Sequence, residues 1–168
     1  NQLMTNKIKF SIDGKEYVAE PTESIWYVAK KNNIVIPLLC YSAEPGYRGD
    51  GICLACMVEI KGERTLDASC IRKPTEGMEV TVNSPRAEKS RSMVFELLVS
   101  DQPSKEHSPD PDSKFWNWSE KMGVSSSRFP GKEKINIDRS HKAMSVNLDA
   151  CINCNLCVRA CREVQVND

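Results

Sequence analysis

The eight cysteines of this 168-residue chain fall into two sets, with no cysteine from residue 71 to residue 150. The first set is Cys40, Cys53, Cys56 and Cys70, and the second is Cys151, Cys154, Cys157 and Cys161. Both sets contain C-x-x-C pairs, and such closely spaced thiolates suit a metal better than they suit disulfides that staple loops. The pattern therefore predicts two metal-binding regions.

The charge balance and the hydropathy pattern narrow the possible partners and the compartment. Lys plus Arg equals Asp plus Glu at 23 each, so the charge gives no reason to expect nucleic acid or an anionic membrane as a partner. No apolar run approaches the roughly 18 residues of a membrane span, and no segment resembles a secretory signal peptide. The first methionine is Met4, so we interpret residues 1–3 as a cloning remnant. We expect a cytoplasmic protein.

The first half of the chain carries strand and turn signals around one short helix. Apolar residues alternate through KIKFSI and stop at an Asp-Gly pair, which favours a hairpin because glycine accepts the positive φ of a tight turn. We expect a short helix next, with Thr22 as its N-cap. Its inner face would comprise Ile25, Val28 and Ala29. Three further strands follow at CMVEI, ERTLDASC and MEVTVN, so residues 5–83 are predicted to be an α+β domain of β-grasp type.

The first cysteine set has 12, 2 and 13 residues between its successive members. A [2Fe–2S] cluster needs four thiolates, two for each iron, and a C-x-x-C loop supplies two closely spaced sulfurs. The stretch EPGYRGDGI lies between Cys40 and Cys53, and its glycines let backbone N–H groups turn toward sulfur, which raises the reduction potential. We predict a [2Fe–2S] site at Cys40, Cys53, Cys56 and Cys70, with a zinc site or reduced core thiols as the alternatives.

The surrounding sequence resembles a known group of domains. The stretch IPLLCYSAEPGYRGDGICLACMVEIKGERTLDASCIRKPTEGMEV is similar to the N-terminal [2Fe–2S] domain shared by several electron-transfer subunits. These belong to respiratory complex I, iron-only hydrogenases and NAD-dependent formate dehydrogenases. The long gap between Cys40 and Cys53 is similar to that group, whereas plant-type ferredoxins have C-x4-C there. The resemblance implies a ferredoxin-like domain that carries electrons.

Residues 84–123 are predicted to form a helical segment and residues 124–146 a linker rich in Ser, Pro and Lys. Ser84 is the expected N-cap of the first helix, with proline at the first helical position. The apolar stripe expected on this helix comprises Ala87, Val94, Leu97 and Leu98. A second short helix in SKFWNWSEKMG is capped by Asp112 or Ser113. The face of this helix that we expect to pack as core comprises Phe115, Trp118 and Met122.

The first of these helices separates the chain from two of the groups that it resembles. In complex I and iron-only hydrogenases, the matching helix leads into a motif of one His and three Cys that binds a [4Fe–4S] cluster. Here Gln102 stands where that His is expected, and residues 71–150 contain no cysteine. We therefore expect no cluster in this region and propose that the packed second helix fills its place. We interpret His107 and His141 as solvated loop residues.

The second cysteine set has the spacing C-x2-C-x2-C-x3-C of bacterial ferredoxins. In that run three cysteines bind one [4Fe–4S] cluster and the fourth binds another, so two clusters need eight thiolates where residues 147–168 supply four. We interpret residues 147–168 as the first half of a [4Fe–4S] ferredoxin-type domain and the chain as an N-terminal fragment. The segment is expected to be disordered or held by contacts with other molecules. A zinc site is the alternative interpretation of these four cysteines.

A closer resemblance extends over nearly the whole chain. The stretches YRGDGICLACMVEIKGERTLDASCIRKPTEGM, FWNW, SSSRFP and NLDACINCNLCVRACREVQVND are similar to the alpha subunit of NAD-dependent formate dehydrogenases that use molybdenum or tungsten. The resemblance implies that the chain relays electrons between a molybdenum or tungsten pterin site, in the missing part, and flavin- and NAD-binding diaphorase subunits. No nucleophile–base pair or phosphate loop appears, so we expect no catalytic site in this chain itself. The alternatives are a segment of a hydrogenase or complex I-type oxidoreductase, and a zinc-stabilised interaction module.

Overall fold

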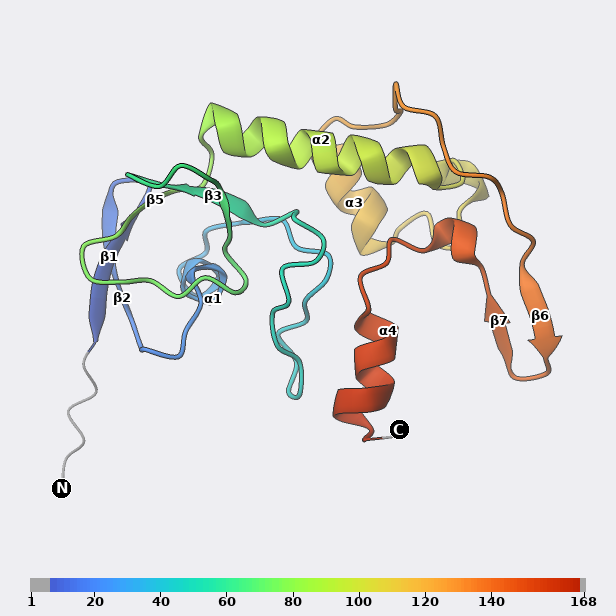
Figure 1. Cartoon of the computed structure of the whole chain (residues 1–168), viewed down its shortest axis with the longest axis horizontal. Helices are drawn as coiled ribbons and strands as arrows, with labels where there is room; N and C mark the ends of the chain where they lie inside the picture. The colour runs from blue at the N-terminus through green and yellow to red at the C-terminus, as the bar shows by residue number, and fades with distance from the viewer. Residues whose placement is uncertain (1–6, 167–168) are drawn as a thin grey trace. The chain divides into compact units, whose positions relative to one another are not determined.

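The structure, a computed structural model, describes residues 7–166, which form two compact units. The first unit comprises the described residues up to Arg91 together with those from Asn155 onward, and the second is Ser92–Cys154. The long helix α2 (Pro85–Asp101) begins in the first unit and ends in the second (Figure 1). No helix in the described part of the chain is long and apolar enough to cross a membrane.

The first unit is built on a mixed five-stranded sheet. Its strands are β1 (Ile8–Ile12), β2 (Lys15–Ala19), β3 (Met57–Ile60), β4 (Asp67–Ala68) and β5 (Glu79–Thr81). Their order is β2-β1-β5-β3-β4, and β1 and β5 run parallel while the other neighbouring pairs are antiparallel. The hairpin between β1 and β2 turns at Asp13 and Gly14, both at positive φ, as the sequence predicts. The mixed sheet expected for this region is confirmed.

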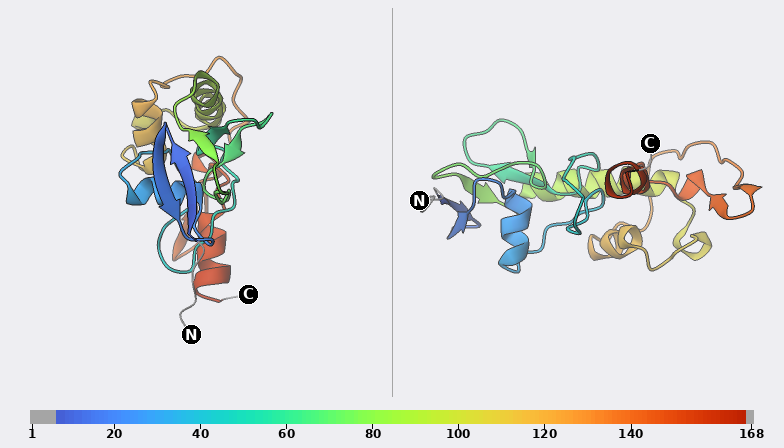
Figure 2. Two further views of the ribbon diagram at one scale, coloured as in Figure 1. Left: turned by 90° about the vertical axis from the view of Figure 1, so that its left-hand side faces the viewer. Right: turned by 90° about the horizontal axis from the view of Figure 1, so that it is seen from below.

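Helix α1 (Ile25–Lys31) lies beside the sheet (Figure 2). Its buried residues are Ile25, Val28 and Ala29, the inner face that the sequence predicts. The predicted N-cap, Thr22, is wrong. The cap is Ser24, whose Oγ accepts a hydrogen bond from the Tyr27 N–H at 3.2 Å. The cap lies two residues later because the N–H of Glu23 bonds to the Glu20 carbonyl at 3.0 Å, which forms a turn before the helix.

The core of the first unit lies between α1 and the sheet and includes two of the cysteines. Its buried members include Phe10, Ile12, Val28, Val58, Val80, Val82, Cys56 and Cys70. Removing this much apolar surface from water is the main stabilising contribution to such a domain. Cys56 and Cys70 are therefore held by the packing of the whole domain.

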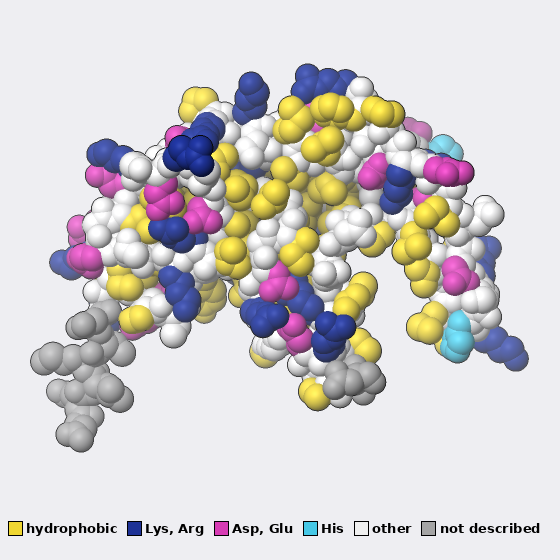
Figure 3. Space-filling model, viewed as in Figure 1, with side chains coloured by type: hydrophobic (Ala, Val, Ile, Leu, Met, Phe, Trp, Pro, Cys, Tyr) yellow, Lys and Arg dark blue, Asp and Glu magenta, His cyan; other side chains and the backbone are white. Residues whose placement is uncertain are grey.

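Outside the core, basic and acidic side chains are interspersed over the face shown in Figure 3.

In the second unit, the aromatic residues of α2 and α3 (Lys114–Lys121) pack together. The rings of Phe95 and Phe115 stack with centroids 5.9 Å apart, and Trp116 lies edge-on to Phe115 at 5.0 Å. Two parts of the predicted faces are wrong. In α2, Phe95 is buried while Leu97 is 48% exposed, and in α3, Trp116 is buried while Trp118 is only partly so. Ala87 and Phe115 are buried as predicted, and the rest of each buried face differs from the prediction where Phe95, Phe115 and Trp116 pack against one another.

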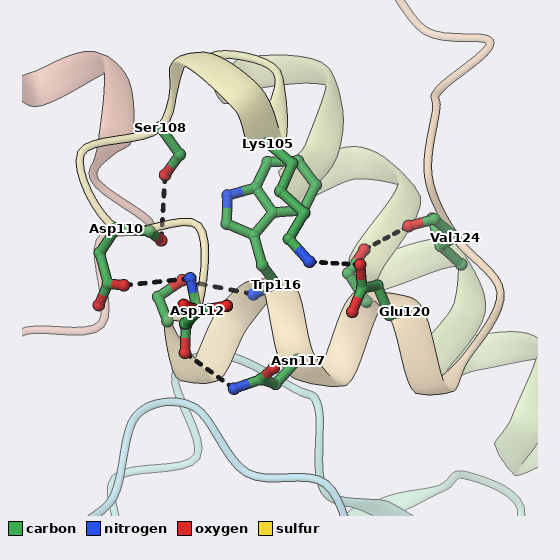
Figure 4. Close-up of polar contacts among 10 residues, drawn as sticks. Lys105, Ser108, Asp110, Asp112, Trp116, Asn117, Glu120 and Val124 are labelled. Atoms are coloured by element: carbon green, nitrogen blue, oxygen red, sulfur yellow. Dashed lines mark hydrogen bonds and ion pairs between the residues drawn. The ribbon is translucent and has the colours of Figure 1, made fainter.

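Polar contacts fasten both ends of α3 (Figure 4). Ser113 Oγ accepts from the Trp116 N–H at 3.4 Å, which makes Ser113 the N-cap, one of the two residues predicted. The buried Ser119 hydroxyl donates to the Val124 carbonyl just after the helix. Lys105 forms an ion pair with Glu120, so the turn before α3 is joined to its last turn. These contacts define a short helix with fixed ends inside the predicted segment 84–123.

Residues 124–146, predicted as a linker, contain a two-stranded hairpin that was not predicted from the sequence. Its strands are β6 (Asp138–His141) and β7 (Met144–Val146), and every residue in them is exposed. The sequence DRSH has no apolar alternation, so it gives no strand signal. His141 therefore lies in a strand, where its Nδ1 accepts from the Ala143 N–H at 3.1 Å, and its side chain is exposed as expected.

Candidate metal centre

The four cysteines of the first set come together in the first unit. Cys40 follows the apolar segment 34–39, Cys53 and Cys56 flank a tight turn before β3, and Cys70 follows β4. The Cys40 sulfur is hydrogen bonded to the thiols of Cys53 and Cys70, and the Cys56 sulfur is hydrogen bonded to Cys70. Cys40 and Cys56 are completely buried and Cys70 is 5% exposed. The sulfurs of these four cysteines therefore form one connected group.

Backbone N–H groups point at these sulfurs. The Cys53 N–H donates to the Cys40 sulfur at 3.5 Å, and the Ala55 N–H donates to the Cys53 sulfur at the same distance. Leu54, between them, has φ +56, an uncommon conformation for a branched residue and one that recurs at functional sites. It folds the C-x-x-C turn back on itself, so that its amides face sulfur. Such bonds stabilise negative charge on a thiolate, as an iron–sulfur cluster requires.

Glycine in the long loop permits a close backbone approach. A Cβ atom on Gly49 would lie 2.3 Å from the Cys70 carbonyl oxygen, a distance that no side chain tolerates. The loop therefore passes directly against the main chain of Cys70. The sequence alone predicts only N–H orientation for the glycines of this loop, and the structure adds this contact as a reason for Gly49.

The proximity of the sulfurs changes their acidity. Hydrogen bonds from Cys53 and Cys70 lower the pKa of Cys40, and a hydrogen bond from Cys70 lowers the pKa of Cys56. The same bonds, together with burial, raise the pKa of Cys53 and of Cys70. The opposed shifts have one physical cause, the closeness of the four sulfurs. Metal binding to cysteine sulfur requires the thiolate form and releases protons.

The start of α1 secures the turn that carries Cys70. The N–H groups of Ile25 and Trp26 donate to the carbonyls of Arg72 and Ser69, each at 2.9 Å. The hydroxyl of Ser69, which is completely buried, donates to the Cys56 carbonyl at 2.7 Å. Ser69 thereby connects the two cysteines nearest the core. This role was not predicted, and only the place of Ser69 next to a cysteine could have suggested it.

The donor set suits a two-iron cluster. Among the residues that the structure describes, no three or more His, Cys, Asp or Glu side chains are arranged to hold a single metal ion. A [2Fe–2S] cluster has a different requirement, because each of its two irons takes only two protein thiolates. Four connected, largely buried sulfurs with amides directed at them fit that requirement.

The second cysteine set is less buried than the first and is divided between the two units. Cys151 and Cys154 belong to the second unit and are partly buried, while Cys157 and Cys161 belong to the first and are exposed. Helix α4 (Leu156–Arg159) carries Cys157, and a π-helical turn (Ala160–Val164) carries Cys161. The expectation of a disordered or externally held segment is wrong for these residues, because buried Arg159 bonds to this chain's own backbone. Residues 167–168 lie outside the described residues.

Gln102, which stands where related sequences are expected to have a ligand histidine, bonds to the backbone of the second set. Its Nε2 donates to the Cys151 carbonyl at 3.4 Å within the second unit. His107 is exposed, and its Nδ1 is 2.8 Å from the Ser104 hydroxyl. In this chain the side chain at position 102 therefore bonds to the main chain of Cys151.

Comparison with known proteins supports the N-terminal site. Residues 5–85 match the family model described as a 2Fe-2S iron-sulfur cluster binding domain. The N-terminal region is a [2Fe–2S] domain. This ferredoxin-like domain has a mixed sheet with few helices and serves in electron transfer.

Three relatives place this domain among oxidoreductases. The chain is 31% identical over 164 residues to NADP-reducing hydrogenase subunit HndD of Solidesulfovibrio fructosivorans, covering 94% of the chain and 28% of the relative. It is 26% identical over 163 residues to the mitochondrial NADH-ubiquinone oxidoreductase 78 kDa subunit of Candida albicans, covering 94% and 22%. Putative formate dehydrogenase YrhE of Bacillus subtilis is 25% identical over 170 residues, covering 96% and 17%. The chain thus spans less than a third of each of these relatives.

A solved structure extends the likeness beyond the [2Fe–2S] domain. A chain in the crystal structure of NAD+-reducing [NiFe]-hydrogenase in the H2-reduced state superposes with a TM-score of 0.79 at 26% identity. The match covers 92% of this chain and 65% of that chain. The chain is therefore homologous to subunits of hydrogenases and NADH-quinone oxidoreductases. The formate dehydrogenase predicted from the sequence is represented by a less similar relative, at 25% identity against 31%.

Proposed function

We propose that Cys40, Cys53, Cys56 and Cys70 bind one [2Fe–2S] cluster through which the chain relays single electrons. The observation that carries this proposal is the meeting of four sulfurs, with amides directed at them, inside a domain of the [2Fe–2S] family. When bound, a cluster of this type supplies one-electron chemistry at about −400 mV if it is ferredoxin-like. The chain's own residues hold the thiolates, shield three of them from water and donate N–H bonds to sulfur.

We further propose that the parent protein is an NAD-linked formate dehydrogenase. Gln102 and the absence of cysteine from 71 to 150 support this assignment, because the related complex I and iron-only hydrogenase regions are expected to carry a cluster there. Formate would be oxidised at a molybdenum or tungsten pterin site outside residues 1–168. Electrons would then pass through this chain toward flavin- and NAD-binding partner subunits in the cytoplasm.

The second candidate is a hydrogenase or NADH-quinone oxidoreductase subunit. Two observations favour it: the 31% identity to a hydrogenase subunit and the TM-score of 0.79 against a NAD+-reducing hydrogenase. In either parent, Cys151, Cys154, Cys157 and Cys161 would supply ligands to [4Fe–4S] clusters together with cysteines from outside this chain.

The cluster is tested on the chain itself, produced and purified without oxygen. We expect brown protein with iron and inorganic sulfide in equal amounts, and an EPR signal of one unpaired electron per chain after reduction. Cys53→Ser and Cys70→Ser should each remove that signal. Colourless protein that contains zinc would overturn the proposal in favour of the zinc module.

The parent activity is tested on the native complex that contains this chain. Formate, hydrogen and NADH are supplied separately, and reduction of the [2Fe–2S] EPR signal is followed by rapid freezing. Rapid reduction by formate and by NADH, but not by hydrogen, supports a formate dehydrogenase. Reduction by hydrogen supports the second candidate. Reduction by NADH alone points to an NADH-quinone oxidoreductase type of subunit.

A further inference from the structure

One arginine inside the second cysteine motif is buried against the loop of the first. Arg159 lies between Cys157 and Cys161 in sequence and is 4% exposed, whereas its neighbour Arg162 is exposed. Its Nη1 donates to the Arg48 carbonyl at 2.7 Å, and its Nη2 donates to the carbonyl of Cys40. A buried guanidinium with two backbone acceptors is a specific contact, because charged groups are rarely buried without partners.

The loop also supplies an anion and an aromatic ring to the same guanidinium. Arg159 Nε lies 3.3 Å from Asp50 Oδ2, which makes an ion pair but no hydrogen bond at Nε. The guanidinium carbon lies 6.0 Å from the centre of the Tyr47 ring. These partners all come from residues 40–50, which make up most of the loop between Cys40 and Cys53.

Two further contacts fasten the same loop to the same C-terminal segment. Arg48 Nη2 lies 3.5 Å from Glu163 Oε1. A Cβ atom on Gly46 would lie 3.2 Å from Val164 Cγ2, so the tip of the loop passes close to the π-helical turn. Contacts at Cys40, Gly46, Arg48 and Asp50 together fix the loop along its length. An irregular loop of this length has few internal bonds of its own, so such external contacts limit its motion.

We propose that Arg159 is a positioning residue for the [2Fe–2S] site. Through this side chain the second cysteine motif holds the loop that carries Cys40 and Cys53 in place. This rests on the proposed function, since it concerns the cluster that those cysteines are proposed to hold. The arginine fixes the main chain at Cys40 and places a positive charge beside it. A nearby positive charge stabilises the more negative, reduced form of a cluster, so it raises the reduction potential. The same side chain is a hydrogen-bonded link between the two cysteine motifs.

The test compares three single variants of the full chain with the unaltered chain. Arg159→Gln removes the charge, Arg159→Lys keeps the charge but loses the two-pronged contact, and Arg162→Gln is the matched control in which an exposed charge is removed three residues away. The midpoint potential is measured by EPR-monitored titration, and the motion of residues 43–52 by hydrogen exchange.

We expect Arg159→Gln to lower the midpoint potential and to speed exchange in the loop, while Arg162→Gln changes neither. In Arg159→Lys the positive charge remains, so the midpoint potential should fall less than in Arg159→Gln. Hydrogen exchange in the loop should still be faster than in the unaltered chain. If Arg159→Gln does not yield folded protein, the lysine variant and its exchange rates carry the test.

The outcomes separate the inference from the proposed function. Unaltered chain that shows no [2Fe–2S] signal overturns the proposed function. If the cluster is present but the Arg159 variants match the unaltered chain in potential and loop exchange, the inference alone is wrong. Equal shifts in the Arg159→Gln and Arg162→Gln variants also overturn it, because they indicate a general effect of charge rather than a positioning contact.

Discussion

The two cysteine sets have similar local spacing but differ in how the protein supports them. Three of the four cysteines in the first set are buried, and two belong to the core of the domain. In the second set Cys157 and Cys161 are exposed, and the pairs 151/154 and 157/161 belong to different units. The comparison shows that spacing indicates the chemistry of a site, while burial indicates whether the fold itself already brings the ligands together.

The same contrast appears in the residues around each set. Cys56 and Cys70 are joined through Ser69 and the first turn of α1, so their positions depend on regular structure. The C-terminal motif is secured by a residue that is not a cysteine, Arg159. We expect changes around the first set to affect cluster assembly and domain stability together. Changes at the second set should affect neither, except at Arg159.

The largest effect is expected from Gly49→Ala, which tests the close packing of the first set. The added Cβ would meet the Cys70 carbonyl at 2.3 Å, so the loop must move away from Cys70. Because Cys40 and Cys53 lie at the two ends of this loop, we expect most of the [2Fe–2S] absorbance to be lost. The measurement is the iron content and visible spectrum of the purified chain.

Gly62→Ala is the control for this variant. Gly62 also lies in a turn, at φ +85, but no atom lies within 4 Å of its added Cβ. It should cost about 1 kcal/mol for the left-handed backbone and keep its cluster. A Gly49→Ala chain with a full complement of iron would contradict the close approach of the loop to Cys70.

The contrast between the two sets also shows what the sequence can and cannot predict. The mixed sheet of the first unit was predictable because apolar alternation and the Asp-Gly turn are local signals, although the strand predicted in ERTLDASC is only the two residues Asp67–Ala68. Ser69 joins Cys56 to Cys70 through a contact between residues that are 13 positions apart in the sequence. Arg159 bonds to the Cys40 carbonyl across 119 positions. No periodicity encodes such contacts, so neither was predicted.

The errors in the helices have a similar origin. The sequence predicts Thr22 as N-cap, but a turn at Glu20–Glu23 delays the helix to Ser24. The buried face of α2 contains Phe95 because it stacks on Phe115 of α3, and neither helix alone shows this partnership. The hairpin at β6 and β7 has no buried face and therefore no apolar pattern to detect.

A second buried arginine tests how strongly the body of the first unit is held together. Arg91 donates to the carbonyls of Met57 and Val82 and to the Asn83 side chain, and it is 5% exposed. Arg91→Met keeps most of the apolar volume but leaves these acceptors without their donor. We expect the free energy of unfolding to fall by about 3 kcal/mol, measured by urea denaturation.

The control is Arg86→Met on the same helix. Arg86 is exposed and makes one bond, to the Arg64 carbonyl at 2.8 Å. Its loss should cost less than about 1 kcal/mol. Equal losses from the two variants would mean that the burial of Arg91 contributes nothing to stability.

A smaller effect is expected at the cap of α1. Ser24→Ala removes the acceptor for the Tyr27 N–H and should lower the free energy of unfolding by about 1 kcal/mol. Because the adjacent amides hold the Cys70 turn, cluster loss in the presence of an iron chelator should also be faster. Thr22→Ala, at the cap predicted from sequence, is the control and should change the free energy by less than about 0.5 kcal/mol. A larger loss of stability from Thr22→Ala than from Ser24→Ala would mean that Thr22 is the cap.

The smallest effect is expected at the second set itself, in Cys157→Ser. This side chain is exposed and lies outside the core cluster, so the substitution removes no packing. The free energy of unfolding should stay within about 0.5 kcal/mol of the unaltered chain, and the [2Fe–2S] EPR signal should persist. Cys56→Ser, the same substitution at a completely buried position, should remove the signal and destabilise the domain. Loss of the [2Fe–2S] signal in Cys157→Ser would show that the two sets share ligands, and the distinction between a supported and an exposed set would then fail.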